Sequence, residues 1–207
     1  MIEGEDTARR FCAERADDAG MARLELFATR LAEENGRQNL VSSASLEAIW
    51  QRHFADSLQL LDPVPRRTAP WLDLGSGAGI PGLAIACARP DDTIILIESR
   101  KRRVEWLIRA AEELALSNCR IFGSRLENVE TFPAAVITAR AFAPLGKLLD
   151  LSARFSTRDT IWLLPKGRSA AQELSQQPPG VRALFHVEQS LTDPEGGILL
   201  GRGTVRR

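Results

Sequence analysis

The sequence has 207 residues, of which 44% are apolar, and its formal net charge is zero. This size and composition predict one globular domain, or one domain with an appendage, and the charge argues against a generally basic nucleic-acid binder. The chain has no run of about 18 apolar residues and no apolar segment behind a basic N-terminus, so neither a membrane span nor a signal peptide is predicted. We therefore expect a cytoplasmic, monomeric protein.

The cysteines bear on a metal site, and the basic residues bear on a polyanionic partner. Cys12, Cys87 and Cys119 are scattered and show neither metal-ligand spacing nor a disulfide framework, so no metal site is predicted. A single basic cluster is more often a solvated surface, but several together permit a polyanionic partner without requiring one. The clusters are Arg66–Arg67, Arg100–Arg103 and Arg202–Arg207.

Residues 1–66 predict an N-terminal helical appendage. A long helix is expected over residues 6–35, with a break near Gly20, and Gly36 is expected to end it in the left-handed conformation. A second helix is expected over residues 46–61, before a segment that contains two prolines.

His53, Asp56 and Ser57 fall at positions i, i+3 and i+4 of the second helix and therefore share one face. On spacing alone, a functional cluster and a hydrogen-bond cluster at the helix surface are equally good interpretations.

From residue 71 onward the pattern changes to alternating strands and helices, which predicts an α/β core over residues 67–207 with a mostly parallel, Rossmann-like sheet. An antiparallel pair, residues 181–187 and 198–200, is expected to close the sheet. The other strands are expected at residues 71–74, 93–97, 119–122, 134–138 and 160–164, and the helices at residues 83–88, 100–115, 145–153 and 169–176.

The first strand of this core runs into a glycine-rich loop. Gly75, Gly77, Gly79 and Gly82 follow Trp71–Leu74, and alternate glycines let a ligand lie directly against the backbone. A helix begins at once behind the loop, so free backbone N–H groups face the ligand. The stretch predicts a nucleotide-type pocket, although a merely tight turn would share part of the pattern.

Two ligands compete for this loop. Gly77-x-Gly79-x-x-Gly82 satisfies the dinucleotide fingerprint, which is weak evidence when it stands alone. Asp73, however, precedes the first glycine, and Asp-x-Gly-x-Gly-x-Gly is typical of S-adenosylmethionine (SAM) methyltransferases, where the carboxylate can help to hold the cationic amino-acid end of SAM. We favour SAM over NAD.

Polar residues at the carboxyl ends of the strands are the next candidates, because ligands of open α/β sheets bind there. Glu98 ends the second strand and could accept both ribose hydroxyls of an adenosine, or could instead cap the following helix. Ser124 and Glu127 have the spacing of a capping box. Arg140 and Lys166 follow the fourth and fifth strands, where two cations would suit an anionic substrate such as RNA phosphate.

The chemistry that is missing restricts the reaction. Cytosine-C5 methylation needs a cysteine nucleophile beside a proline at a strand end, and none of the three cysteines has this setting. Amino-group methylation of bases typically uses Asn or Asp before Pro-Pro and an aromatic residue, whereas Pro178–Pro179 is followed by Gly180. The remaining target is a ring nitrogen with a free lone pair, which needs only positioning in line with the methyl group.

These residues resemble the bacterial ribosomal RNA small subunit methyltransferase G family, also called GidB-like, over residues 39–167. The order and spacing of seven motifs carry the resemblance. They are Asn39-Leu40, Arg52-His53-Phe54-x-Asp56-Ser57, Asp73–Gly82, Glu98-Ser99-x-x-Arg102, Arg125-x-Glu127, Arg140–Ala143 and Lys166-Gly167. Pro165 and the stretch Gly196–Arg202 depart from the family pattern at the substrate rim.

The resemblance implies a class I SAM-dependent methyltransferase acting on guanine N7 in the 16S rRNA of the small ribosomal subunit. It places SAM contacts at Gly75, Ile80, Leu126, Glu127 and Arg140, to which we add Gly77 and Glu98. It places Asn39, His53 and Asp56 on the substrate side, where we also assign Arg125, and we assign catalysis to Arg140 and Lys166. The rival functions are an NAD-dependent oxidoreductase and a non-catalytic RNA-binding assembly factor.

Overall fold

The computed structural model describes residues 1–205 and shows one seven-stranded sheet in the order β3-β2-β1-β4-β5-β7-β6. Strands β1 to β5 are parallel to one another, and β7 lies antiparallel between β5 and β6. This confirms the predicted mostly parallel sheet with an antiparallel closing pair. The strands are β1 Trp71–Leu74, β2 Ile94–Glu98, β3 Cys119–Gly123, β4 Val136–Thr138, β5 Ile161–Gly167, β6 Phe185–Gln189 and β7 Gly197–Arg202.

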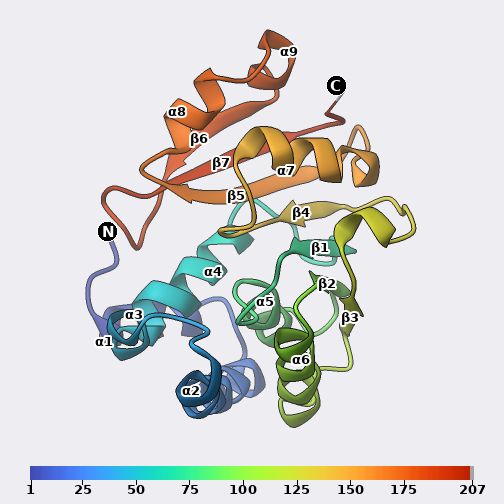
Figure 1. The fold of residues 1–207 in the computed structure, drawn as a ribbon. Helices are drawn as coiled ribbons and strands as arrows, with labels where there is room; N and C mark the ends of the chain where they lie inside the picture. Colours follow the sequence, from blue (N-terminus) through green and yellow to red (C-terminus); the bar gives the residue numbers. More distant parts are fainter. Residues whose placement is uncertain (206–207) are drawn as a thin grey trace.

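Helices cover both faces of the sheet (Figure 1). One core contains residues of α2, α5 and α6, and the other contains residues of α7, α8 and the far side of the sheet. The α-helices are α1 Glu5–Ala13, α2 Asp18–Gln38, α3 Ser43–Glu47, α4 Asp56–Leu58, α5 Gly82–Ala88, α6 Lys101–Glu113, α7 Leu145–Ser152, α8 Ala170–Ser175 and α9 Pro179–Arg182; the other turns are η1 Trp50–Ala55, η2 Gln59–Leu61, η3 Leu126–Asn128 and η4 Ala153–Phe155.

The N-terminal helices share the first of these cores. The ring of Phe27 on α2 lies 5.5 Å from that of Phe54 and 6.4 Å from that of Trp106 on α6, measured between centroids. Phe27 and Phe54 are completely buried. The helices of residues 1–66 therefore pack against α5 and α6 and share one hydrophobic core with them.

The expected first helix is two helices. Asp17 caps α2 by accepting a hydrogen bond of 2.7 Å from the N–H of Gly20, which places the break before Gly20. Gly36 lies inside α2, and Asn39 takes the left-handed conformation instead, with φ of 37°. Asparagine tolerates that conformation, so the prediction that Gly36 ends the helix is wrong.

The expected second helix is also interrupted. Ser42 caps α3, and the chain then passes through the π-helical turn η1 before α4 and η2. A π-helical turn often marks a functional site, because it inserts a residue and changes the direction in which side chains point. Here it contains His53 and is followed directly by Asp56.

Strand β5 is longer than expected and includes Lys166, which we had placed after the strand. Pairing with β4 ends at Leu163, while pairing with β7 continues to Gly167 through an irregularity at Pro165. The segment expected to begin β6 forms α9 instead. Within residues 1–205 no helix is long and apolar enough to span a membrane; Arg206 and Arg207, the end of the third basic cluster, lie outside this range.

Candidate active site

The glycines of the loop permit the positive φ that the chain needs here, but the N–H groups of Gly75 to Gly77 and of Gly79 are bonded within the chain rather than free as expected. Gly75, Gly77 and Gly79 have φ of 67°, 53° and 90°. The N–H groups of Gly75 and Ser76 both donate to the carbonyl of Ile97 on β2, at 2.9 and 3.1 Å. A Cβ on Gly75 would lie 2.7 Å from Cδ2 of Phe142, so this glycine permits a close approach that another residue would block.

A cavity of about 460 Å³ opens beside this loop, at the carboxyl ends of the strands. It collects five residues predicted from the sequence, and its wall includes the apolar side chains of Ile97 and Leu151. The predicted residues are Gly75, Glu98, Arg125, Leu126 and Glu127. Its volume lies within the range of small-molecule sites, and we call it the cofactor cavity.

Glu98 is buried in the wall of the cofactor cavity and accepts three backbone hydrogen bonds. Its Oε1 accepts from the N–H groups of Ser99 and Arg100, both at 2.8 Å, and its Oε2 accepts from the N–H of Gly77 at 3.1 Å. Glu98 thus fastens the glycine loop to the start of α6. A carboxylate has about four acceptor positions, so ribose binding by Glu98 stays a prediction beside this capping role.

One expectation around this cavity is wrong, and the role of Asp73 in binding SAM stays a prediction. Ser124 and Glu127 form no capping box, because the Ser124 hydroxyl donates to the carbonyl of Arg125 and no side chain caps η3. The Asp73 side chain, 1% exposed, does not line the cavity but faces Gly82 of α5. Its carboxylate has no hydrogen-bond partner within residues 1–205, and burial raises the pKa of Asp73 to about 7.

A second cavity, of about 840 Å³, lies across the segment Ala141–Ala143 from the first. These three residues line both cavities, and we call them the dividing loop. The second cavity brings together His53, Asp56, Arg140 and Lys166, which the sequence assigned to substrate binding and catalysis. We call it the substrate-side cavity.

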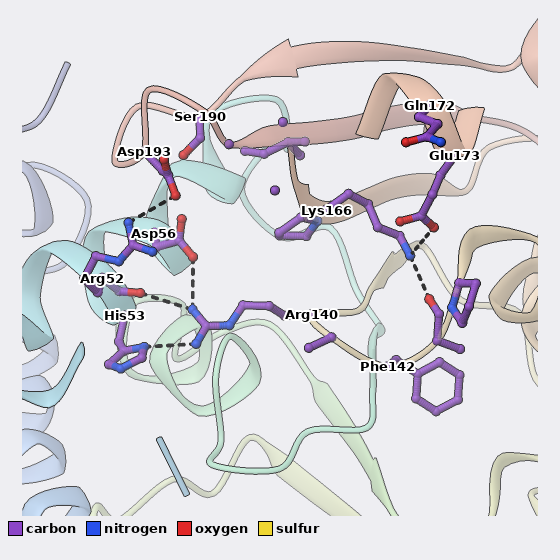
Figure 2. A pocket seen from close by; sticks show the side chains of 18 of the residues that line it. Arg52, His53, Asp56, Arg140, Phe142, Lys166, Gln172, Glu173, Ser190 and Asp193 are labelled. Carbon is purple, nitrogen blue, oxygen red and sulfur yellow. Dashed lines mark hydrogen bonds and ion pairs between the residues drawn. The ribbon is translucent and has the colours of Figure 1, made fainter. Parts of the chain in front are cut away.

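Arg140 is the centre of a hydrogen-bond network in this cavity (Figure 2). Its Nη1 donates to the carbonyl of Arg52 at 3.1 Å and pairs with Oδ2 of Asp56 at 3.0 Å, and its Nη2 donates to Nδ1 of His53 at 3.0 Å. One guanidinium after β4 therefore contacts η1 and α4 together. Arg140 does not line the cofactor cavity, and neither do Gly77 and Ile80.

The contacts of His53 determine its protonation. Arginine can only donate, so Nδ1 of His53 accepts, and its Nε2–H donates to the Ser45 hydroxyl at 3.1 Å. Burial, together with the nearby charges of Arg140 and Arg52, lowers the pKa of His53 to about 3. The imidazole is neutral, with both nitrogens bound, and is not arranged as a general base.

The loop between β6 and β7 closes this side of the cavity, which sequence reasoning missed. Asp56 Oδ1 accepts from the Thr192 hydroxyl at 2.7 Å and from Gln59 Nε2 at 2.9 Å. The Arg52 guanidinium pairs with Asp193 at 3.2 Å. Thr192 and Asp193 lie outside the seven family motifs, so no motif pointed to these contacts.

Lys166 is held by neighbours rather than free to meet an anion. Its Nζ donates to the carbonyl of Ala143 at 2.7 Å and pairs with Glu173 at 3.1 Å, and its side chain is only 9% exposed. Glu173 also accepts from the N–H of Leu145 at 2.6 Å and from the Ser169 hydroxyl at 2.7 Å. Although burial opposes it, these hydrogen bonds and Lys166 hold the pKa of Glu173 below its usual range.

Two predicted substrate residues lie elsewhere. Arg125 lines the cofactor cavity, and Asn39 lines a third cleft, of about 530 Å³, together with Arg37, Gln38 and residues 100–103. The structure therefore separates them from the cluster around Arg140. No group of acids, histidines and cysteines in the described chain could hold a metal ion.

The cofactor cavity fits SAM better than NAD. The dinucleotide-binding fold has the strand order 3-2-1-4-5-6, whereas here the antiparallel β7 is inserted between β5 and β6. Leu126 in the cavity wall offers an apolar surface to a base.

Comparison with known proteins gives one consistent result. A family model described as rRNA small subunit methyltransferase G matches residues 21–196. A ribosomal RNA small subunit methyltransferase G of Erythrobacter litoralis is 58% identical over 100% of both chains, and that of Novosphingobium aromaticivorans is 54% identical over 90% of this chain and 82% of the relative. A TehB-like SAM-dependent methyltransferase of Corynebacterium glutamicum has the same fold, with a TM-score of 0.52, 14% identity and coverage of 72% of this chain and 88% of the other.

Proposed function

The chain belongs to the rRNA small subunit methyltransferase G family, and we propose that its two cavities bind the two reactants on either side of the dividing loop. The enzyme is a SAM-dependent methyltransferase that modifies N7 of a guanine in 16S rRNA. The observation that carries the proposed division is that Ala141–Ala143 lines both cavities, so reactants in them are neighbours. Neither an oxidoreductase nor a non-catalytic assembly factor is favoured.

The reaction requires positioning rather than proton transfer. Bound SAM supplies a methyl group on a positively charged sulfur. The lone pair of guanine N7 forms the new N–C bond while the electron pair of the S–C bond returns to sulfur, so the positive charge moves to the guanine and no proton leaves. A neutral His53 with both nitrogens bound agrees with a site that needs no general base.

The cofactor roles are assigned along the wall of the cofactor cavity. Gly75 and Gly77 admit the ligand against the backbone, Glu98 accepts from its ribose, and Leu126 and Glu127 lie beside its adenine. Ile80 supports the loop from the start of α5, where it is 5% exposed. The lining of the cavity supports the assignments of Gly75, Glu98, Leu126 and Glu127, whereas Gly77 is assigned from the glycine loop and Ile80 from the family motif.

Arg140 and Lys166 are assigned to the boundary between the two cavities. Arg140 immediately precedes the dividing loop, and Lys166 binds its last carbonyl, so both fix the wall across which the methyl group passes. His53 and Asp56 orient Arg140 from the substrate side. Asn39 and Arg125 are assigned to parts of the RNA farther from the target base.

Residues 1–66 supply one side of the substrate-side cavity, and we assign residues 67–207 to the SAM-binding core. The partner is 16S rRNA, either alone or in the small ribosomal subunit. We further propose that the enzyme acts in the cytoplasm as a monomer without a resident metal.

The decisive experiment maps methylated nucleosides by mass spectrometry in small-subunit rRNA from cells with and without this protein. Loss of N7-methylguanosine at one position, restored by the wild-type gene, supports the proposal. His53→Ala, Asp56→Asn and Lys166→Ala are expected to bind SAM nearly normally by calorimetry yet to methylate poorly. If the His53 and Asp56 variants lose stability and SAM binding together, these residues only hold the helices to the sheet.

A further inference from the structure

Arg140 and Lys166, the two cations expected to meet an anionic substrate at the strand ends, are already engaged, whereas other cations form no ion pair within residues 1–205. Arg140 pairs with Asp56, and Lys166 pairs with Glu173. Five other cations beside the cofactor cavity form no ion pair within residues 1–205, and we call them the cationic rim. They are Arg100, Lys101, Arg103, Arg125 and Lys147.

The cationic rim extends along both the cofactor cavity and the third cleft. Arg100 and Arg103 line both the cofactor cavity and the third cleft, and Arg103 Nη1 lies 3.2 Å from where a Cβ on Gly77 would be. In the described chain, Glu127 is the one exposed acid that lines either hollow, because Glu98 is buried against backbone N–H groups. The rim therefore has a strong excess of positive charge.

Local helix stability does not explain this charge. Arg100 occupies the N-cap position of α6 without a side-chain capping hydrogen bond, and Lys101–Arg103 form the first turn, which contains no acid. The N-terminus of a helix is its positive end, so cations there are unfavourable and acids are preferred. A sequence that opposes a local preference without a structural gain is characteristic of a functional surface.

SAM does not explain the charge either. It carries a net positive charge, so a ring of free cations repels it, whereas a polyanion is attracted. We propose that the cationic rim is the surface on which the phosphate backbone of the substrate RNA lies, while the target guanine enters the substrate-side cavity across the dividing loop. This inference rests on the proposed function for the identity of the polyanion. Contacts of this kind position a nucleic acid without reading its sequence.

The test compares two double variants of the full chain that each remove two positive charges. Arg100→Gln with Lys101→Gln alters the rim. The matched control, Arg158→Gln with Arg182→Gln, alters exposed arginines that line none of the described cavities. Binding is measured as a function of salt concentration, with 16S rRNA transcribed in vitro and with small ribosomal subunits from cells lacking this methyltransferase.

The rim variant should bind both probes roughly tenfold or more weakly near 0.1 M salt, and its salt slope should fall by about one unit per lost phosphate contact. Its SAM affinity, measured by calorimetry, should not fall, because the removed charges repel SAM, and its Tm should not fall. The control should bind RNA as wild type does.

Two outcomes overturn the inference: wild-type RNA binding by the rim variant, or equal losses in both double variants, which would indicate only bulk charge. A parallel assay of methyl transfer by wild-type enzyme separates the two proposals. If RNA binding depends on the rim but no guanine N7 is methylated, the surface stands and the proposed function fails. If guanine N7 is methylated but the rim variant binds RNA as wild type does, the proposed function stands and the inference about the cationic rim fails.

Discussion

Charged side chains that bind one another line the substrate-side cavity. The cofactor cavity is lined instead by the backbone of the glycine loop and by cations without ion-pair partners in residues 1–205. In the first, Arg140, Asp56 and His53 link the helices of residues 1–66 to the end of β4. In the second, Gly75 lets the ring of Phe142 approach the loop backbone, and Arg100 and Arg103 form no ion pair within residues 1–205. The difference indicates that the contacts between its own side chains preorganise the substrate side, while the cations of the cofactor side remain available to ligands.

The largest effect is expected from Gly75→Val. Valine at φ of 67° is strained, and its Cβ would lie 2.7 Å from Phe142, so we expect SAM affinity to fall at least 100-fold, about 2.8 kcal/mol or more. Calorimetry measures the affinity, and circular dichroism checks that the variant is folded.

Gly36→Ala is the control, because nothing lies within 4 Å of its new Cβ. This variant should bind SAM normally, and its free energy of unfolding should rise by up to about 1 kcal/mol. Unchanged affinity in Gly75→Val would show that the loop is only a turn.

Glu98→Ala should weaken SAM binding by about 1.5–3 kcal/mol, because it removes a charged acceptor. The same change frees the N–H groups of Gly77, Ser99 and Arg100. Glu98→Gln sharpens the comparison, since it keeps an acceptor oxygen but loses the charge, and an intermediate affinity is expected. A SAM affinity within about twofold of wild type for Glu98→Ala would place the ribose elsewhere.

Arg140→Ala should reduce the free energy of unfolding by about 2 kcal/mol, because it leaves Asp56 and His53 without their shared donor. Methylation and SAM binding should both decline, since Arg140 directly precedes the dividing loop. Urea unfolding and calorimetry measure these effects. Arg140→Lys is the companion variant: lysine cannot reproduce the forked contact, so stability should be restored only in part. A variant as stable as wild type would contradict the preorganised network.

The smallest effect concerns pH. The pKa of His53 falls to about 3 in the folded protein, so the unfolded chain binds the extra proton first, and stability falls as the pH drops below about 6.5. Between pH 7 and 5.5 this site should account for about 1 kcal/mol of lost stability, which His53→Gln should abolish. His186→Gln, at an exposed histidine, is the control and should retain the loss. Identical pH slopes for His53→Gln and wild type would refute the buried, neutral imidazole.

Sequence periodicity was sufficient for the sheet and the glycine loop, because both depend on local signals. Apolar runs bounded by glycines marked β1 and its turn, and the acid ending β2 was found from its position alone. The helix ends were less predictable: Asn39 and Asp17, rather than Gly36 and Gly20, determine them through local hydrogen bonds. The π-helical turn η1 left no periodicity signal, although it orients His53.

The sequence predicted which residues lie at the site, but it did not predict the ion pairs that they form. The sequence placed Arg140 and Lys166 at neighbouring strand ends, and the structure confirms that both line one cavity. It could not show that Asp56 and Glu173 neutralise them, because those partners come from distant elements. For the same reason Lys166 looked like a free cation, whereas Arg100, Lys101 and Arg103, which form no ion pair within residues 1–205, lie at the start of α6.

The hydrogen bonds between residues 51–59 and the β6–β7 loop also have a consequence for the order of synthesis. Gln59 binds Leu191, which is made 132 residues later, and Asp56 binds Thr192, made 136 residues later. At 5–20 residues per second, the early segment waits roughly 7–27 s for these partners. The wall of the substrate-side cavity is therefore among the last parts of the molecule to be completed, and a nascent chain shorter than about 190 residues lacks that wall even when its glycine loop and β1–β5 are already formed.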